Sequence, residues 1–236
     1  MITLKKSKTL KEITEEWDRI ASFREKQIQS QKDHSANHIL APSILKELRN
    51  SPSTIDIGCG TGWLTIRASE FSKDIIGVDP SRKSIEIANS NNSNEFTCYH
   101  SETIEEYSKS GVKFDTAISN MSASCSPDLT SFLVATRKVL NTDGLFVFTI
   151  PHPCFWPIYW GYSSDSTFEY NKTFAVEGEF KIQNETSTFL TTHFHHPLEL
   201  YVKVIQSACF KIEAINELEG KGFPFPRFVL IKLKAV

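Results

Sequence analysis

The sequence predicts a doubly wound α/β fold built on a mostly parallel β-sheet. Two observations support this prediction. Short apolar runs alternate with helical stretches from Thr54 to Ile150, which is the pattern of strands joined by crossover helices. The run Leu145–Ile150 is almost continuously apolar, as expected of a parallel strand that is buried on both faces.

The elements follow from these runs in chain order. Strands are expected where four to six apolar residues cluster, and helices where apolar residues recur at a spacing of three or four. The expected strands are 54–57, 75–78, 96–99, 114–119 and 145–150, and the expected helices are 64–71, 81–88, 102–107 and 129–140.

Residues 1–50 are expected to be helical. Ile13, Trp17, Ile20 and Ala21 recur at helical spacing, and a second short stripe, 44–48, follows Pro42. Both stripes fit helices that pack on the body of the domain. They equally fit a lid, because a helix that precedes the sheet can fold across the mouth of a ligand pocket.

The alternating pattern stops after residue 150. Residues 151–197 are aromatic and polar, which predicts a loop and a β-hairpin inserted after the fifth strand. A helix at 198–208 and strands at 210–215 and 227–233 are expected to follow. We therefore expect one domain over 1–236: a helical lid (1–50), a sheet core (51–150), the insertion (151–197) and a C-terminal helix with strands (198–236).

Composition narrows the class of protein. Among 236 residues, 26 Lys and Arg oppose 28 Asp and Glu, so the basic excess of a duplex-binding protein is missing. The five cysteines are an odd number with no CxxC pair, which is unlike a disulfide framework. The first residues resemble no signal peptide, and no apolar run approaches the roughly 18 residues that span a bilayer. A soluble, cytoplasmic protein is expected.

The most informative segment is the glycine-rich turn between the first core strand and its helix, Asp56-Ile-Gly-Cys-Gly-Thr-Gly62. Glycine lets the backbone turn sharply and approach a ligand closely. The spacing differs from the dinucleotide fingerprint G-x-G-x-x-G, since Trp63 stands where that fingerprint has its third glycine. Asp56 would repel a pyrophosphate but attract an ammonium or sulfonium. A cationic or zwitterionic ligand with a nucleoside part is therefore predicted.

A second acid, Asp79, stands nineteen residues after Gly60, at the end of the next expected strand. A carboxylate at that place can accept two hydrogen bonds from a ribose diol. Alternatively, Asp79 is an acid favoured by the dipole at a helix N-terminus. Its combination with the glycine turn favours the ribose interpretation.

In these residues the chain resembles the class I S-adenosylmethionine-dependent methyltransferases. The glycine turn, Asp79, the segment Phe114–Met121 and the segment Val139–Leu145 follow the family's order and spacing over about residues 50–150. The turn Ile150-Pro-His-Pro-Cys-Phe155 and, more weakly, His195–Tyr201 resemble a bacterial small-molecule branch of that superfamily. The resemblance implies a Rossmann-like, seven-stranded sheet whose last strand runs antiparallel to the others.

The resemblance also implies a donor site for S-adenosylmethionine. The glycines would contact its methionine part, Asp56 its amino group, and Asp79 its ribose, while the amides of Ser101 and Glu102 would meet the adenine. Asn120 and Met121 would lie beside the transferable methyl, and Trp63 would form an apolar wall. The full predicted set is Asp56, Gly58, Cys59, Gly60, Gly62, Trp63, Asp79, Pro80, Ser101, Glu102, Asn120 and Met121.

Methyl transfer requires alignment, exclusion of water and, for some acceptors, removal of a proton. We expect His152, Asn120 and His195 to serve the acceptor side, with His152 as a possible general base near neutral pH. His152 also fits a turn residue between two prolines, hydrogen-bonded to the backbone. His193 and His195 share a strand face, but no fitting third ligand accompanies them, so no metal site is expected.

The leading functional hypothesis is methyl transfer to an oxygen, nitrogen or carbon atom of a small molecule, in a monomer or homodimer without nucleic-acid or membrane partners. Transfer to RNA or protein is the alternative, and the near-neutral charge argues against it. An NAD-dependent oxidoreductase is disfavoured by Asp56 and Trp63. A non-catalytic binding module is disfavoured because Asp56 and all three glycines are present.

Overall fold

The computed structural model describes residues 2–182 and 188–236. A seven-stranded sheet forms its centre, in the order β4-β3-β2-β5-β6-β10-β9. Its strands are β2 (Ser51–Ile57), β3 (Ser72–Val78), β4 (Thr97–His100), β5 (Phe114–Asn120), β6 (Leu140–Pro151), β9 (Phe210–Glu219) and β10 (Pro226–Ala235).

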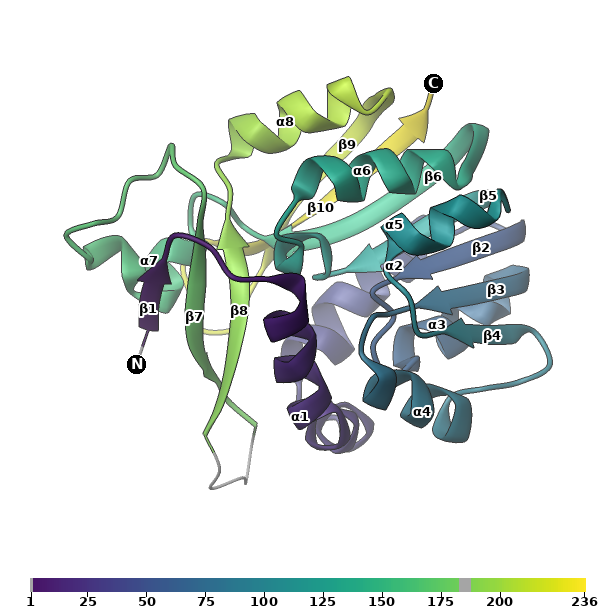
Figure 1. The fold of residues 1–236 in the computed structure, drawn as a ribbon, viewed down its shortest axis with the longest axis horizontal. Coiled ribbons are helices and arrows are strands. Elements are labelled where there is room, and N and C mark those ends of the chain that lie inside the picture. The colour runs from purple at the N-terminus through teal and green to yellow at the C-terminus, as the bar shows by residue number, and fades with distance from the viewer. Residues whose placement is uncertain (1, 183–187) are drawn as a thin grey trace.

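Helices cover both faces of this sheet (Figure 1). One face packs on α5 (Ile104–Tyr107), α6 (Leu129–Lys138) and α8 (Leu198–Ser207), through a core that includes the stacked rings of Phe146 and Phe148. The other face packs on α2 (Ala41–Glu47) and α3 (Trp63–Ala68), around Ile75, Ile118 and Val147. The fold class predicted from the sequence is confirmed.

Strand directions follow the prediction as well. β2 pairs in parallel with β3 and β5, β3 with β4, and β5 with β6. β10 pairs antiparallel with both β6 and β9, as the resemblance implied for the last strand. The chain runs outward from β2 to β4 and then returns to the other side of β2 with β5. The carboxyl ends of β2 and β5 therefore flank a topological switch point, where ligands of open α/β sheets bind.

A second, three-stranded antiparallel sheet has the order β1-β7-β8. β7 (Phe174–Phe180) and β8 (Phe189–His195) form the expected inserted hairpin, whose connection over 183–187 lies outside the described residues. β1 (Ile2–Lys5) was not predicted, because residues 1–50 were expected to be helical. It forms because Ile2–Lys5 pair with 175–178 of β7, a contact between segments about 170 residues apart. The short helix α7 (Trp156–Trp160) also replaces part of the expected loop.

The longest helix, α1 (Leu10–Gln29), lies between the two sheets (Figure 1). A capping box fixes its start, because the Thr9 hydroxyl accepts from the Glu12 amide and the Glu12 carboxylate accepts from the Thr9 amide. Its predicted apolar stripe is buried: Ile13 packs with Ala175 and Phe194 of the second sheet. Helix α4 (Arg82–Asn91) lies beside β4 and packs on α1.

Candidate functional site

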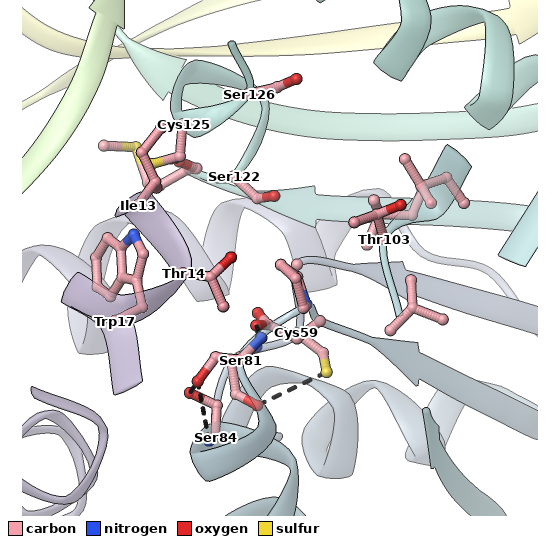
Figure 2. A pocket seen from close by; sticks show the side chains of 18 of the residues that line it. Ile13, Thr14, Trp17, Cys59, Ser81, Ser84, Thr103, Ser122, Cys125 and Ser126 are labelled. Atoms are coloured by element: carbon pink, nitrogen blue, oxygen red, sulfur yellow. Dashed lines mark hydrogen bonds between the residues drawn. The ribbon is translucent and has the colours of Figure 1, made fainter. Parts of the chain in front are cut away.

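A cavity of about 510 Å³ opens at the switch point, within the size range of small-ligand sites. The glycine turn, the loop after β3, the start of α5, the end of β5 and one side of α1 enclose it. In Figure 2, Ile13, Thr14 and Trp17 of α1 lie across the cavity from Cys59, Ser81 and Ser84. α1 thus forms a wall of the cavity, which is the position expected of a lid.

Most residues of the predicted donor site line this cavity: Asp56, Gly58, Cys59, Gly60, Trp63, Asp79, Pro80, Glu102, Asn120 and Met121. Gly62 and Ser101, which the sequence also predicted for the donor site, are not among the residues that line the cavity. Ser101 is exposed, whereas its neighbours Glu102, Thr103 and Ile104 line the cavity.

The three glycines of the turn all have positive φ, of 71°, 54° and 79° in chain order, but they differ in surroundings. A Cβ on Gly60 would meet nothing within 4 Å, so this backbone faces open space in the cavity. A Cβ on Gly58 would collide with the Ser122 side chain. One on Gly62 would lie 2.7 Å from the Tyr99 hydroxyl and 2.9 Å from Cβ of Ala88. The third glycine is therefore required for packing at the start of α3, and its contact with a ligand stays a prediction.

Asp56 lies at the floor of the cavity, only 1% exposed. Its Oδ2 accepts a hydrogen bond of 2.7 Å from the Thr65 hydroxyl. The pKa of Asp56 is raised to about 7, mainly by burial and to a lesser degree by the negative charge of Asp79, while the bond from Thr65 opposes the rise. Among the described residues, no Lys or Arg forms an ion pair with Asp56. A buried carboxyl in this condition is stabilised in its ionised form by a cation that a ligand brings.

Asp79 joins the two loops that frame the cavity. Its Oδ2 accepts from the Gly60 amide at 2.9 Å, and its Oδ1 accepts from the Ser81 amide at 2.8 Å. Burial raises the pKa of Asp79 to about 6, and these two amide bonds moderate the rise. Each carboxylate oxygen has a second lone pair, so the side chain can still accept from a ligand's hydroxyl groups.

Asn120 ends β5 at the cavity wall. The Thr149 hydroxyl donates to Oδ1 of Asn120 at 2.7 Å, and the same hydroxyl accepts from the Met121 amide at 3.2 Å. Because Thr149 holds the amide oxygen, the amide nitrogen of Asn120 is the group that can donate to a ligand. No feature of the sequence near Asn120 pointed to Thr149, which lies in the neighbouring strand β6.

The two histidines expected on the acceptor side do not line this cavity. His152 Nδ1 accepts from the Cys154 amide at 3.1 Å, and Nε2 contacts Glu217 Oε1 at 2.8 Å. His152 is thus a buried turn residue, which matches the alternative interpretation. His195 Nε2 donates to the Tyr170 carbonyl at 2.9 Å, and its ring stacks on Phe174. His195 is held within the inserted region, whereas His152 is held between its own turn and Glu217 of β9.

Other lining residues were not singled out from the sequence. Thr14, Arg24 and Ile28 come from α1, and Ser122 and Cys125 follow β5. The helical stripe around Ile13 and Trp17 was a usable indication that one face of α1 is covered, but it could not show what covers it.

Within the described residues, no group of three or more His, Cys, Asp or Glu side chains could hold a metal ion. Likewise, no helix in 2–182 or 188–236 has the length and apolarity to cross a bilayer.

Comparison with known proteins agrees with this geometry. A family profile described as a methyltransferase domain matches residues 25–198. The ubiquinone biosynthesis O-methyltransferase of Rhizobium etli is 32% identical over 99 residues, which are 41% of this chain and 40% of that protein. The chain therefore aligns with about two fifths of the length of its curated relatives.

Solved structures share the fold. An S-adenosylmethionine-dependent methyltransferase from Clostridium acetobutylicum superposes with a TM-score of 0.65 at 18% identity, covering 93% of this chain and 98% of that one. The DhpI protein, solved as a SAM-HEP complex, superposes with a TM-score of 0.67 at 14% identity, covering 96% and 99% of the two chains.

The packing role of Gly62 predicts a stability difference between two glycines. Gly62→Ala should lower the free energy of unfolding by about 2–4 kcal/mol, because left-handed backbone costs about 1–2 kcal/mol and the crowded Cβ adds a similar amount. Gly111→Ala, at φ 75° with nothing within 4 Å of the new Cβ, should show the backbone cost alone. Urea denaturation measures both. Equal losses would contradict the packing role.

Proposed function

The chain belongs to the methyltransferase domain family, and from that premise we propose that it transfers the methyl group of S-adenosylmethionine to a small-molecule acceptor. The observation that carries the proposal is the cavity at the switch point, with the buried, cation-free carboxyl of Asp56 on its floor and Asp79 on its wall. S-Adenosylmethionine combines an ammonium group, which suits Asp56, with a ribose diol, which suits Asp79.

The donor brings an activated methyl group, so the protein has to align the reactants and exclude water. Asp56 would anchor the ammonium group and Asp79 the ribose hydroxyls, which fixes the donor at two points. Because nothing crowds the backbone at Gly60, the part of the donor between these two points can approach the glycine turn closely. α1 covers this arrangement with Ile13 and other apolar side chains, which supports exclusion of water from the reacting atoms.

The acceptor would lie between α1 and the segment after β5. Ile13, Trp17, Met121 and Cys125 offer apolar contacts there, and Asn120 offers its amide nitrogen. A hydrogen-bond donor at this place favours an acceptor that presents an oxygen atom. The names of the curated relatives, ubiquinone biosynthesis O-methyltransferases, support the same choice of acceptor atom.

The ribose assignment predicts an effect of Asp79→Ala on binding of S-adenosylhomocysteine. Loss of hydrogen bonds to a charged group should weaken binding by about 2–3 kcal/mol, a rise in Kd of about 30- to 150-fold. Asp74→Ala, which removes an exposed acid of β3, the strand that precedes Asp79, is the matched control and should bind like the wild type. Isothermal titration calorimetry measures both. Wild-type affinity in Asp79→Ala would contradict the assignment.

If Asp56 contacts the ammonium group of the ligand, binding of S-adenosylhomocysteine should release a proton. With a pKa of about 7, Asp56 is more than half protonated at pH 6.5 in the free protein. An ammonium group beside it favours the ionised form, lowers its pKa and releases the proton. Calorimetry at pH 6.5 in buffers of different ionisation enthalpy should detect this release, and at pH 8.5 it should largely disappear. Asp56→Asn should abolish the part of the proton release that comes from Asp56. A wild-type enthalpy that does not depend on the buffer would contradict the assignment.

A further inference from the structure

Helix α1 presents two acids to the loops that frame the cavity. Asp18 and Glu25 are seven residues apart, two turns of helix, so they lie on the same face of α1. Asp18 Oδ1 accepts from the Ser81 hydroxyl at 2.6 Å and from the Lys83 amide at 3.1 Å, at the start of α4. Glu25 reaches the glycine turn, whose residues also line the cavity.

Glu25 is 6% exposed, and its carboxylate accepts hydrogen bonds from three side chains of the described residues. The Thr61 hydroxyl donates to Oε2 at 2.5 Å. The side-chain amides of Asn92 and Gln29 donate to Oε1 at 2.9 and 3.0 Å. A buried carboxylate with this many donors is well satisfied where it lies, and it would lose these partners if α1 moved away.

The same network holds the backbone of the turn. The Asn92 side-chain amide also donates to the Thr61 carbonyl at 2.8 Å, and the Tyr99 hydroxyl donates to the Asn92 carbonyl. Thr61 is 6% exposed and Asn92 is 4% exposed, so water cannot replace these bonds readily. Thr61 is thus held at its side chain by α1 and at its carbonyl by the end of α4. Its neighbour Gly60 is held by Asp79.

From these contacts we propose that Glu25 is a positioning residue for the glycine turn, and that it couples closure of α1 over the cavity to cofactor binding. The inference rests on the proposed function, because it takes the cavity to be the donor site. A ligand seated on the glycine turn favours the turn conformation that Thr61 adopts when bonded to Glu25. By linkage, α1 in its closed position strengthens binding of that ligand to the same degree.

The test compares S-adenosylhomocysteine binding in Glu25→Ala, Glu25→Gln and the wild type. Calorimetry gives the Kd, and stopped-flow fluorescence of Trp17 and Trp63, which both line the cavity, gives the rate of release. Glu25→Ala should raise the Kd about tenfold or more and speed release, since it removes bonds to a buried charged group. Glu25→Gln keeps the shape and can still bond Thr61 and Asn92, so it should recover most of the affinity.

Two further variants separate positioning from general stability. Glu15→Ala removes an exposed acid of the same helix and should leave Kd and release rate unchanged. As a single substitution, Thr61→Val should weaken S-adenosylhomocysteine binding. In the Glu25→Ala background it should raise the Kd little further, if the two side chains act through one bond.

These measurements separate the role of Glu25 from the proposed binding of S-adenosylmethionine. A Glu25→Ala protein with a lower melting temperature but wild-type Kd and release rate would overturn the positioning role and leave the donor site intact. Additive effects of the Glu25 and Thr61 substitutions would overturn the coupling through their bond. A wild-type protein that binds neither S-adenosylmethionine nor S-adenosylhomocysteine would overturn the proposed function together with this inference.

Discussion

The carboxylate of Asp79 is the contact on which the architecture of the site depends. It accepts one amide from the turn after β2 and one from the turn after β3, at 2.9 and 2.8 Å. These turns follow adjacent parallel strands, in which Ile57 pairs with Val78. This side chain joins the two loops beyond the strand ends, where the amides of Gly58 and Cys59 already donate to the Val78 carbonyl at 2.8 and 3.1 Å. The cavity is the space that remains between these loops, β5 and α1.

This arrangement has an electrostatic cost. Asp56 and Asp79 are close enough for the charge of Asp79 to raise the pKa of Asp56, and burial raises the pKa of both. Both effects disfavour the ionised form of Asp56, which a positive charge nearby would stabilise. Helix α1 adds Asp18 and Glu25 to the same region, but each of these acids is satisfied by hydroxyl and amide donors. We therefore propose Asp56, and not these two acids, as the partner of a cationic ligand.

The features that could be predicted from the sequence are those that depend on neighbouring residues. The alternation of strands and helices, the glycine turn and Asp79 at the end of β3 are all local patterns, and all appear in the structure. The resemblance to methyltransferases added the antiparallel last strand, which the structure confirms. The crowding of Gly62 could not be predicted, because Tyr99 comes from another strand, which local spacing cannot reveal.

The remaining features depend on contacts between distant segments. β1 exists only because the inserted hairpin offers an edge to pair with. His152 lies between two prolines after β6 and was a reasonable candidate base, yet its position relative to the cavity depends on Glu217 and on the packing of the insertion. Helical spacing places Glu25, unlike Glu15, on the apolar stripe of α1, four residues after Ala21, but it does not reveal the partners of its carboxylate. Only the placement of the helix against Thr61 and Asn92 does so.

A crystal structure of the protein with S-adenosylhomocysteine would show which groups of the ligand meet Asp56 and Asp79. The account predicts the ligand in the cavity between the glycine turn and α1, with its ribose hydroxyls at hydrogen-bond distance from Asp79 and its ammonium group beside Asp56. The bonds from the Gly60 and Ser81 amides to Asp79 should persist. A ligand bound elsewhere, or one whose ribose and ammonium groups avoid both acids, would contradict it.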